Sequence, residues 1–149
     1  MYRTSFWAVL AFAFFSVNAA AQVKPEVLVE QRQAAMKLQG KYLFPLVPMA
    51  QGRVPYDAAI VARNAGYLDV LIKLAWDGFD PNTQGIRSRA LPEVYSEPAK
   101  FKAAQETVFA EMNKFVAAAR SGNEASTKAA IGDVVKACNG CHDSFRQRQ

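Results

Sequence analysis

Five consecutive residues near the C-terminus, Cys138-Asn139-Gly140-Cys141-His142, combine side chains that can hold a metal cofactor covalently. The C-x-x-C-H pattern is typical of haem attachment. On a helix, Cys138 and Cys141 lie about one turn apart, and His142 follows four positions after Cys138. Two thiols can then form thioethers to the porphyrin vinyl groups while the imidazole coordinates iron as an axial ligand.

Other uses of two neighbouring cysteines fit the sequence less well. The chain contains two cysteines and one histidine, and all three lie in this window. A zinc site would need further Cys or His ligands, and a redox C-x-x-C would accompany a βαβ pattern that the sequence lacks. A structural disulfide or a buried thiol pair would not explain the adjacent histidine. The sequence therefore predicts one haem c, attached through Cys138 and Cys141.

Residues 1–21 have the features of a cleaved secretory signal peptide. Arg3 provides the positive start, residues 6–15 are apolar, and residues 19–21 are small. The apolar run is too short to span a bilayer, so we expect no membrane insertion after cleavage. Residues 22–149 would form one domain. Because bacteria attach haem to such cysteines outside the cytoplasm, the expected location is the periplasm.

The charge of the chain argues against nucleic-acid binding. Cleavage removes one basic residue and no acidic one, so the net charge falls from +5 to +4. No block of lysines or arginines marks a nucleic-acid surface.

Apolar periodicity predicts four helices and no convincing strand. The first runs from about Pro25 to the mid-forties, with a core stripe that repeats every three or four residues: Leu28, Gln31, Ala35, Leu38 and Tyr42. Pro45 and Pro48 should kink or end it. The second begins near Asp57, a plausible N-cap. A turn-rich loop over residues 77–92 follows, with Trp76 and Phe79 at its entrance, where a haem would complete the core.

The last two helices place the cysteines in the core. The third is expected to follow Ser96 as N-cap and to end by Gly122. The fourth begins at Asn123 or Ser126, and its apolar face includes Cys138, Cys141 and His142. Four amphipathic helices with short connections predict an all-α fold, an antiparallel four-helix bundle with covalently bound haem c.

Several segments resemble the class II c-type cytochromes, and within them the cytochrome c′ group. They are KPE at residues 24–26, RQAAM at 32–36, VPYDAA at 54–59, WDGF at 76–79, PEVYSEPAKFK at 92–102 and CNGCHDSFR at 138–146. The haem motif near the C-terminus, with RQAAM upstream, is specific to class II. Residues 87–91 form a slightly longer segment than the family pattern.

The resemblance implies a four-helix bundle with one haem c, usually a homodimer packed through its first two helices. It implies thioethers at Cys138 and Cys141 and an axial His142. Arg32 and Gln33 would then lie at the haem propionates, Met36 on the distal face, and Arg146 near the proximal histidine.

The identity of the sixth iron ligand separates two functions. If Met36 only fills the distal side, the iron is five-coordinate and high-spin and binds nitric oxide or carbon monoxide; the W-x-x-F segment favours this reading. If the Met36 sulfur closes the sixth position, the protein is a low-spin electron carrier that serves redox partner proteins. Arg32 and Met36 lie one turn apart on the first predicted helix and form a stripe beside its core stripe. An enzymatic role is disfavoured, because no acidic residue shares this second stripe and no second histidine exists.

Overall fold

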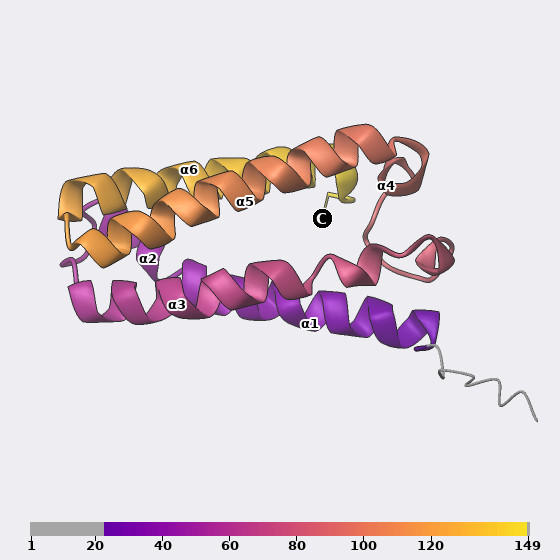
Figure 1. Cartoon of the computed structure of the whole chain (residues 1–149), viewed down its shortest axis with the longest axis horizontal. Helices are drawn as coiled ribbons and strands as arrows, with labels where there is room; N and C mark the ends of the chain where they lie inside the picture. Colours follow the sequence, from indigo (N-terminus) through magenta and orange to yellow (C-terminus); the bar gives the residue numbers. More distant parts are fainter. Residues whose placement is uncertain (1–22, 149) are drawn as a thin grey trace, which may run out of the picture.

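Four long helices run up and down to form an antiparallel bundle (Figure 1). The computed structural model describes residues 23–148, and the predicted signal peptide, residues 1–21, lies outside them. The long helices are α1 (Pro25–Leu43), α3 (Ala58–Leu74), α5 (Pro98–Ser121) and α6 (Glu124–Phe145). The all-α class and the four-helix bundle are as the sequence predicts.

The bundle consists of two helix pairs. α1 packs along α3, α5 packs along α6, and α3 joins the pairs by packing along α5. α1 and α6 are not among the closely packed pairs. The short helix α2 (Leu46–Ala50) contacts α6. Buried apolar side chains of α3, α5 and α6 form most of the core, including Leu68, Phe115 and Val134, and the end of α1 and α2 add Leu43, Leu46 and Met49.

Three helix boundaries are set by local chemistry that the sequence predicts. The Asp57 carboxylate accepts a hydrogen bond from Ile60 N at 3.0 Å, and the Asn123 side chain accepts one from Ser126 N at 2.9 Å, so both act as N-caps. Of the two predicted starts of the last helix, Asn123 is therefore correct. Gly122 ends α5 in the left-handed conformation with φ 71°.

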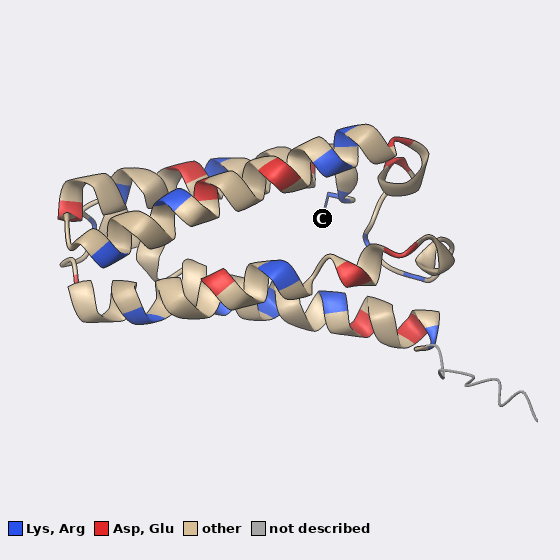
Figure 2. Cartoon of the chain, in the orientation of Figure 1, with Lys and Arg blue, Asp and Glu red and all other residues tan. Residues whose placement is uncertain are grey.

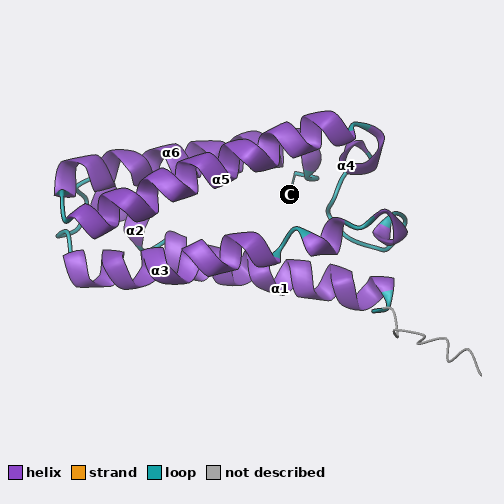
Figure 3. Cartoon of the chain, viewed as in Figure 1, coloured by secondary structure: helices purple, strands orange, loops and turns teal. Residues whose placement is uncertain are grey.

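The connections are more helical than the sequence predicts (Figure 3). The residues that follow Pro45 form the short helix α2, because a proline is tolerated at the start of a helix. The predicted loop contains two 3-10 turns, η1 (Asp77–Phe79) and η2 (Pro81–Thr83). Ser96 is not the N-cap of the third long helix. It ends the separate turn α4 (Glu93–Ser96), and Pro98 then starts α5.

The buried face of α1 differs from the predicted stripe. Its buried residues are Val29, Arg32, Ala35, Gln39 and Leu43, so only Ala35 is shared with the prediction. Leu38 is 41% exposed. The physical reason is that two polar residues of α1 are buried with their hydrogen bonds satisfied: Gln39 Nε2 donates to Leu71 O at 2.9 Å, and Arg32 donates into the loop.

The surface carries charges of both signs along all four long helices (Figure 2). Within residues 23–148, every helix is too short or too polar to cross a membrane.

Candidate cofactor site

All nine residues predicted to contact haem line one cavity between α1 and α6. Its volume is about 1140 Å³. The predicted residues around it are Arg32, Gln33, Met36, Trp76, Phe79, Cys138, Cys141, His142 and Arg146. They come from α1, the start of the loop and the end of α6. The antiparallel arrangement of α1 and α6 explains the convergence, since the start of α1 and the end of α6 lie at the same end of the bundle (Figure 1).

The C-x-x-C-H segment forms the last turns of α6. Cys138 and Cys141 are free and half-buried. Burial raises the pKa of the Cys138 thiol to about 11, with a further contribution from Cys141, and burial also raises the pKa of Cys141. Both sulfurs are therefore neutral thiols at neutral pH. Two such thiols one turn apart on a cavity wall are suitably placed for two thioether bonds.

The environment of His142 favours its neutral form. Burial lowers the pKa of the imidazole below 6.5, and Arg146 and Arg89 lower it further, while Asp143 acts in the opposite direction. Neutral imidazole is the form that coordinates a metal. The backbone helps to fix the position, because Arg146 N donates to His142 O at 3.0 Å at the end of α6.

Aromatic rings form one end of the cavity. The Trp76 ring lies 5.8 Å from both Phe79 and Phe101 between centroids, and Phe101 lies 5.1 Å from Phe145. The indole Nε1 of Trp76 is buried and has no hydrogen-bond partner among residues 23–148. A buried N–H without an acceptor is costly, so an acceptor on a bound group would satisfy it.

Arg32 is buried beside the same aromatic wall. It is 3% exposed, and its guanidinium donates to Gly78 O and, at 3.0 Å, to Ser88 Oγ. No ion pair within the described part of the chain includes Arg32. A buried cation without an acidic partner favours a bound anion nearby.

The lining of the cavity is strongly asymmetric in charge. Six of its side chains are basic, and none of the lining residues from 23 to 148 is Asp or Glu. The basic residues are Arg32, Lys37, Lys41, Arg53, Arg89 and Arg146. A ligand with carboxylates would therefore meet only positive charge.

Sequence reasoning missed several residues at the site. Ser88 and Arg89 line the cavity from the loop, and Phe101 does so from α5. Tyr95 supports the loop, because its hydroxyl lies 2.8 Å from Thr83 Oγ1. No motif marks Ser88 or Arg89 in the sequence. Phe101 lies within a segment that carries the family resemblance, which was its one available signal.

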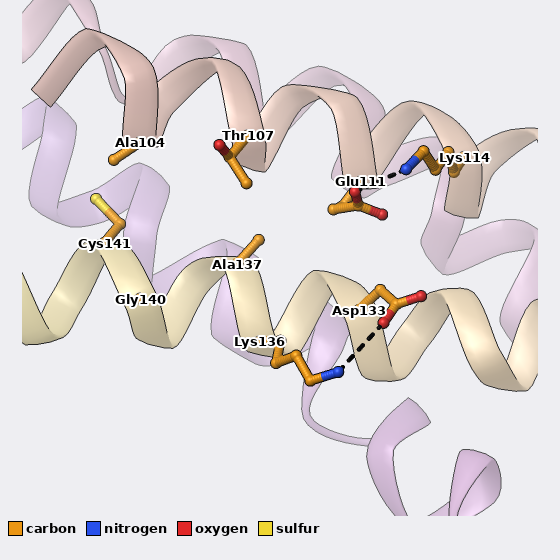
Figure 4. A pocket seen from close by; sticks show the side chains of 9 residues that line it. All are labelled: Ala104, Thr107, Glu111, Lys114, Asp133, Lys136, Ala137, Gly140 and Cys141. Atoms are coloured by element: carbon orange, nitrogen blue, oxygen red, sulfur yellow. Dashed lines mark hydrogen bonds and ion pairs between the residues drawn. The ribbon is translucent and has the colours of Figure 1, made fainter. Parts of the chain in front are cut away.

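A second hollow of about 530 Å³ lies between α5 and α6 (Figure 4). It shares only Cys141 with the main cavity. Its charged residues are paired, with Lys114 2.8 Å from Glu111 and Lys136 3.7 Å from Asp133. Its polar groups therefore satisfy one another, and it offers no comparable set of ligands.

The residues present fit a haem c. The large cavity carries two thiols and an imidazole on one wall, aromatic rings at one end, and both a buried arginine and an unsatisfied indole N–H that could receive propionates. Haem would supply an iron centre that binds diatomic ligands or exchanges an electron.

Comparisons with known proteins agree with this donor set. The family model described as Cytochrome C′ matches residues 27–146. The cytochrome c′ of Rubrivivax gelatinosus is 39% identical over 126 residues, which cover 84% of this chain and 98% of the relative. Two solved structures of cytochrome c prime variants from Alcaligenes xylosoxidans are 37% identical. The nitric oxide complex has a TM-score of 0.80 and covers 86% of this chain and 99% of the other. The carbon monoxide-bound variant has a TM-score of 0.79, with 85% and 98% covered.

Proposed function

We propose that this chain, which belongs to the cytochrome c′ family, binds nitric oxide and carbon monoxide at a five-coordinate haem iron held by His142. The observation that carries the proposal is the convergence of Cys138, Cys141 and His142 on one wall of a cavity whose other wall is α1. The relatives with nitric oxide and carbon monoxide bound support the choice of ligand class.

Each wall of the cavity has a separate task. Cys138 and Cys141 fix the porphyrin to α6, and His142 holds the iron from the proximal side. Arg32 and Gln33 from α1 and the Trp76 indole would bind the propionates, because Arg32 is a buried cation without an acidic partner and the indole N–H has no acceptor. Phe79 packs against the Arg32 guanidinium, and Arg146 lies beside the proximal histidine.

The distal wall selects the gas. Met36 is half-buried on α1, and nearby α3 contributes Leu68 and Ile72 to the same cavity. The buried amide on this wall, Gln39, is already bonded to Leu71 O. Met36, Leu68 and Ile72 would form an apolar face on the distal side, which does not stabilise the charge that develops on bound dioxygen, whereas nitric oxide and carbon monoxide need little such help.

The alternative is a low-spin electron carrier in which Met36 provides the sixth ligand. Met36 lines the cavity opposite the α6 wall, so its placement is compatible with either role. Methionine ligation would raise the haem potential and close the iron to gases. Redox partner proteins would then be the physiological contacts of the site.

Absorption spectra of the ferrous holoprotein with and without carbon monoxide decide between the two. We expect a broad high-spin Soret band that sharpens with the gas, both in the wild type and in Met36→Leu. A wild type that ignores carbon monoxide, together with a Met36→Leu variant that binds it, would establish Met36 as the ligand. Cys138→Ser with Cys141→Ser is the control for attachment and should leave no haem on a denaturing gel.

A catalytic role is not part of the proposal. His142 is the only histidine in the chain, and the described lining of the cavity includes no carboxylate, so neither an imidazole nor a carboxylate is available as general acid or base on the distal side. We expect no turnover with hydrogen peroxide.

We also propose that the protein is exported. Cleavage near residue 21 would deliver residues 22–149 to the periplasm, which N-terminal sequencing of the purified holoprotein would test.

The exposed faces of α1 and α3 support a homodimer. Tyr67, Val70 and Leu74 are exposed on one stripe of α3, and Val27 and Leu38 are exposed on α1 with a spacing that places them on one face. α1 and α3 pack together, so these residues belong to one helix pair. We expect sedimentation to show a dimer that Val70→Lys weakens, whereas Lys102→Ala on α5 should leave it intact.

A further inference from the structure

The loop before α5 and the chain end after α6 are joined by backbone hydrogen bonds. Leu91 N donates to Phe145 O at 3.0 Å, and Gln147 N donates to Arg89 O at 2.8 Å. These bonds surround an antiparallel bridge between Ala90 and Arg146. The Arg89 guanidinium adds a bond of its own to Gln147 O at 2.7 Å. We call residues 88–91 together with residues 145–147 the strap.

The strap is also attached to α1. Ser88 Oγ accepts one hydrogen bond from the Arg32 guanidinium at 3.0 Å and another from Ala90 N at 3.3 Å. Arg32 is buried and in turn donates to Gly78 O. Hydrogen bonds and the short backbone segment between them therefore connect α1 through Ser88 and Ala90 to residues 145–147, at the C-terminal end of the turn that contains His142.

This path spans the gap between α1 and α6. These two helices do not pack closely against each other, and the cavity lies between them. Ser88, Arg89 and Ala90 line that cavity together with His142 and Arg146. The last helical bond of α6, from Arg146 N to His142 O, joins the strap to His142 itself.

We propose that the strap holds the end of α6 and thereby fixes the His142 imidazole relative to α1, with Ser88 and Arg89 as positioning residues. Neither residue acts by touching the iron. They limit the movement of the turn that contains His142 and Arg146. This positioning does not depend on the proposed gas binding.

Two variants break the strap at opposite ends. Ser88→Ala removes the link to α1 and touches neither residue 146 nor residue 147. Arg89→Ala removes the bond to Gln147 O. Arg148→Ala is the control for loss of a positive charge at this end of the chain, since its side chain lies 3.8 Å from Asp143 and outside the strap. Because the Arg89 charge also acts on His142, Ser88→Ala tests the strap without a change of charge. Arg89→Lys retains a donor and the charge, so it should restore the wild-type behaviour.

The first readout is hydrogen–deuterium exchange of the C-terminal peptide in the ferric holoprotein, followed by mass spectrometry. Both Ser88→Ala and Arg89→Ala should accelerate exchange of this peptide by about fivefold or more, whereas Arg148→Ala should not. The second readout is the electron paramagnetic resonance spectrum of the ferric holoprotein. It is sensitive to the orientation of the axial imidazole, whether the iron is high-spin or low-spin. We expect broadened or duplicated signals in both strap variants and wild-type signals in Arg89→Lys.

The outcomes separate this inference from the proposed function. If the C-terminal peptide exchanges at the wild-type rate in Ser88→Ala and Arg89→Ala, the inference about the strap is wrong. Faster exchange with unchanged resonance signals would show that α6 alone positions His142, which also overturns the inference. A wild type that forms no nitric oxide adduct would refute the gas-binding function, and the exchange and resonance measurements would still decide on the strap.

Discussion

The guanidinium carbon of Arg32 lies 4.4 Å from the centroid of the Phe79 ring, so a buried cation is stacked on an aromatic side chain at the end of the cavity. The same guanidinium donates to Gly78 O and Ser88 Oγ. Arg32 thus joins α1 to the loop through two kinds of interaction that need no cofactor.

Replacing Arg32 should therefore cost stability as well as cofactor contacts. We expect Arg32→Leu to lower the free energy of unfolding of the holoprotein by about 2 to 4 kcal/mol, because it leaves buried acceptors without a charged donor. Denaturant unfolding measures this loss. Arg120→Leu is the control, since Arg120 is exposed and should change stability by no more than about 0.5 kcal/mol. A loss below about 1 kcal/mol for Arg32→Leu would mean that water replaces the guanidinium.

Substitution of Gly78 and of Gly66 by alanine should change the stability of the protein in opposite directions. A Cβ on Gly78 would lie 2.6 Å from Leu28 O and would also overlap the Arg32 side chain, so η1 would have to move away from α1. We expect Gly78→Ala to destabilise by about 1 to 3 kcal/mol. Gly66 is in α3 with nothing within 4 Å of the added Cβ, so Gly66→Ala should stabilise by about 0.5 to 1 kcal/mol. Thermal unfolding compares the two, and equal signs would contradict this packing.

Acid should release the proximal histidine in a charge-dependent way. The pKa of His142 is lower in the folded protein than in the unfolded chain, where it is 6.5. The folded protein therefore has its full stability from the neutral imidazole above pH 6.5, and it loses this contribution as the pH falls through the folded-state pKa. In the holoprotein, iron competes with the proton and moves this loss further down. Arg146→Gln should raise the midpoint of the acid transition and Asp143→Asn should lower it, each by about 0.2 to 0.7 of a pH unit.

The Soret band recorded during acid titration reports this midpoint. Asp133→Asn provides the control, because Asp133 also lies on α6 but pairs with Lys136 and is not among the charges that act on His142. Shifts of the same sign for Arg146→Gln and Asp143→Asn would be inconsistent with an electrostatic cause.

The basic lining of the cavity should appear in the kinetics of small redox reagents. An anionic reductant should reduce the haem faster than a neutral one of similar potential, and rising ionic strength should slow it. Stopped-flow rates in Lys37→Gln with Lys41→Gln should show a weaker dependence on salt. Lys102→Gln with Lys136→Gln, on other parts of the surface, is the matched control for net charge.

The sequence predicts most of this molecule because its strongest signals are local. Asp57 and Asn123 cap helices through bonds within one turn, and the face that carries Cys138, Cys141 and His142 follows from helical spacing alone. The predicted site residues of α1, the loop and α6 reach one cavity because the bundle is antiparallel, which the four predicted helices with short connections also indicate.

The errors concern residues whose role depends on distant partners. The core stripe of α1 was misplaced because Arg32 and Gln39 are buried by bonds to the loop and to α3, which apolar periodicity does not detect. Ser88 and Arg89 were missed because their partners lie 56 and 58 positions away in the chain. A loop with few apolar residues gives no periodic signal for such contacts.

Because α1 and α6 do not pack closely against each other, the haem would also have a structural role, as the group that joins these two helices. Side chains join three pairs of neighbouring long helices, α1 with α3, α3 with α5 and α5 with α6. Between α1 and α6 lies the cavity, where a porphyrin would make the fourth contact. Attachment of haem should then stabilise the folded protein, and a less stable fold should hold less haem. A substitution at Leu68 or Ile72, which face both the core and the cavity, would change the yield of mature protein even where it leaves the chemistry of the iron unaltered.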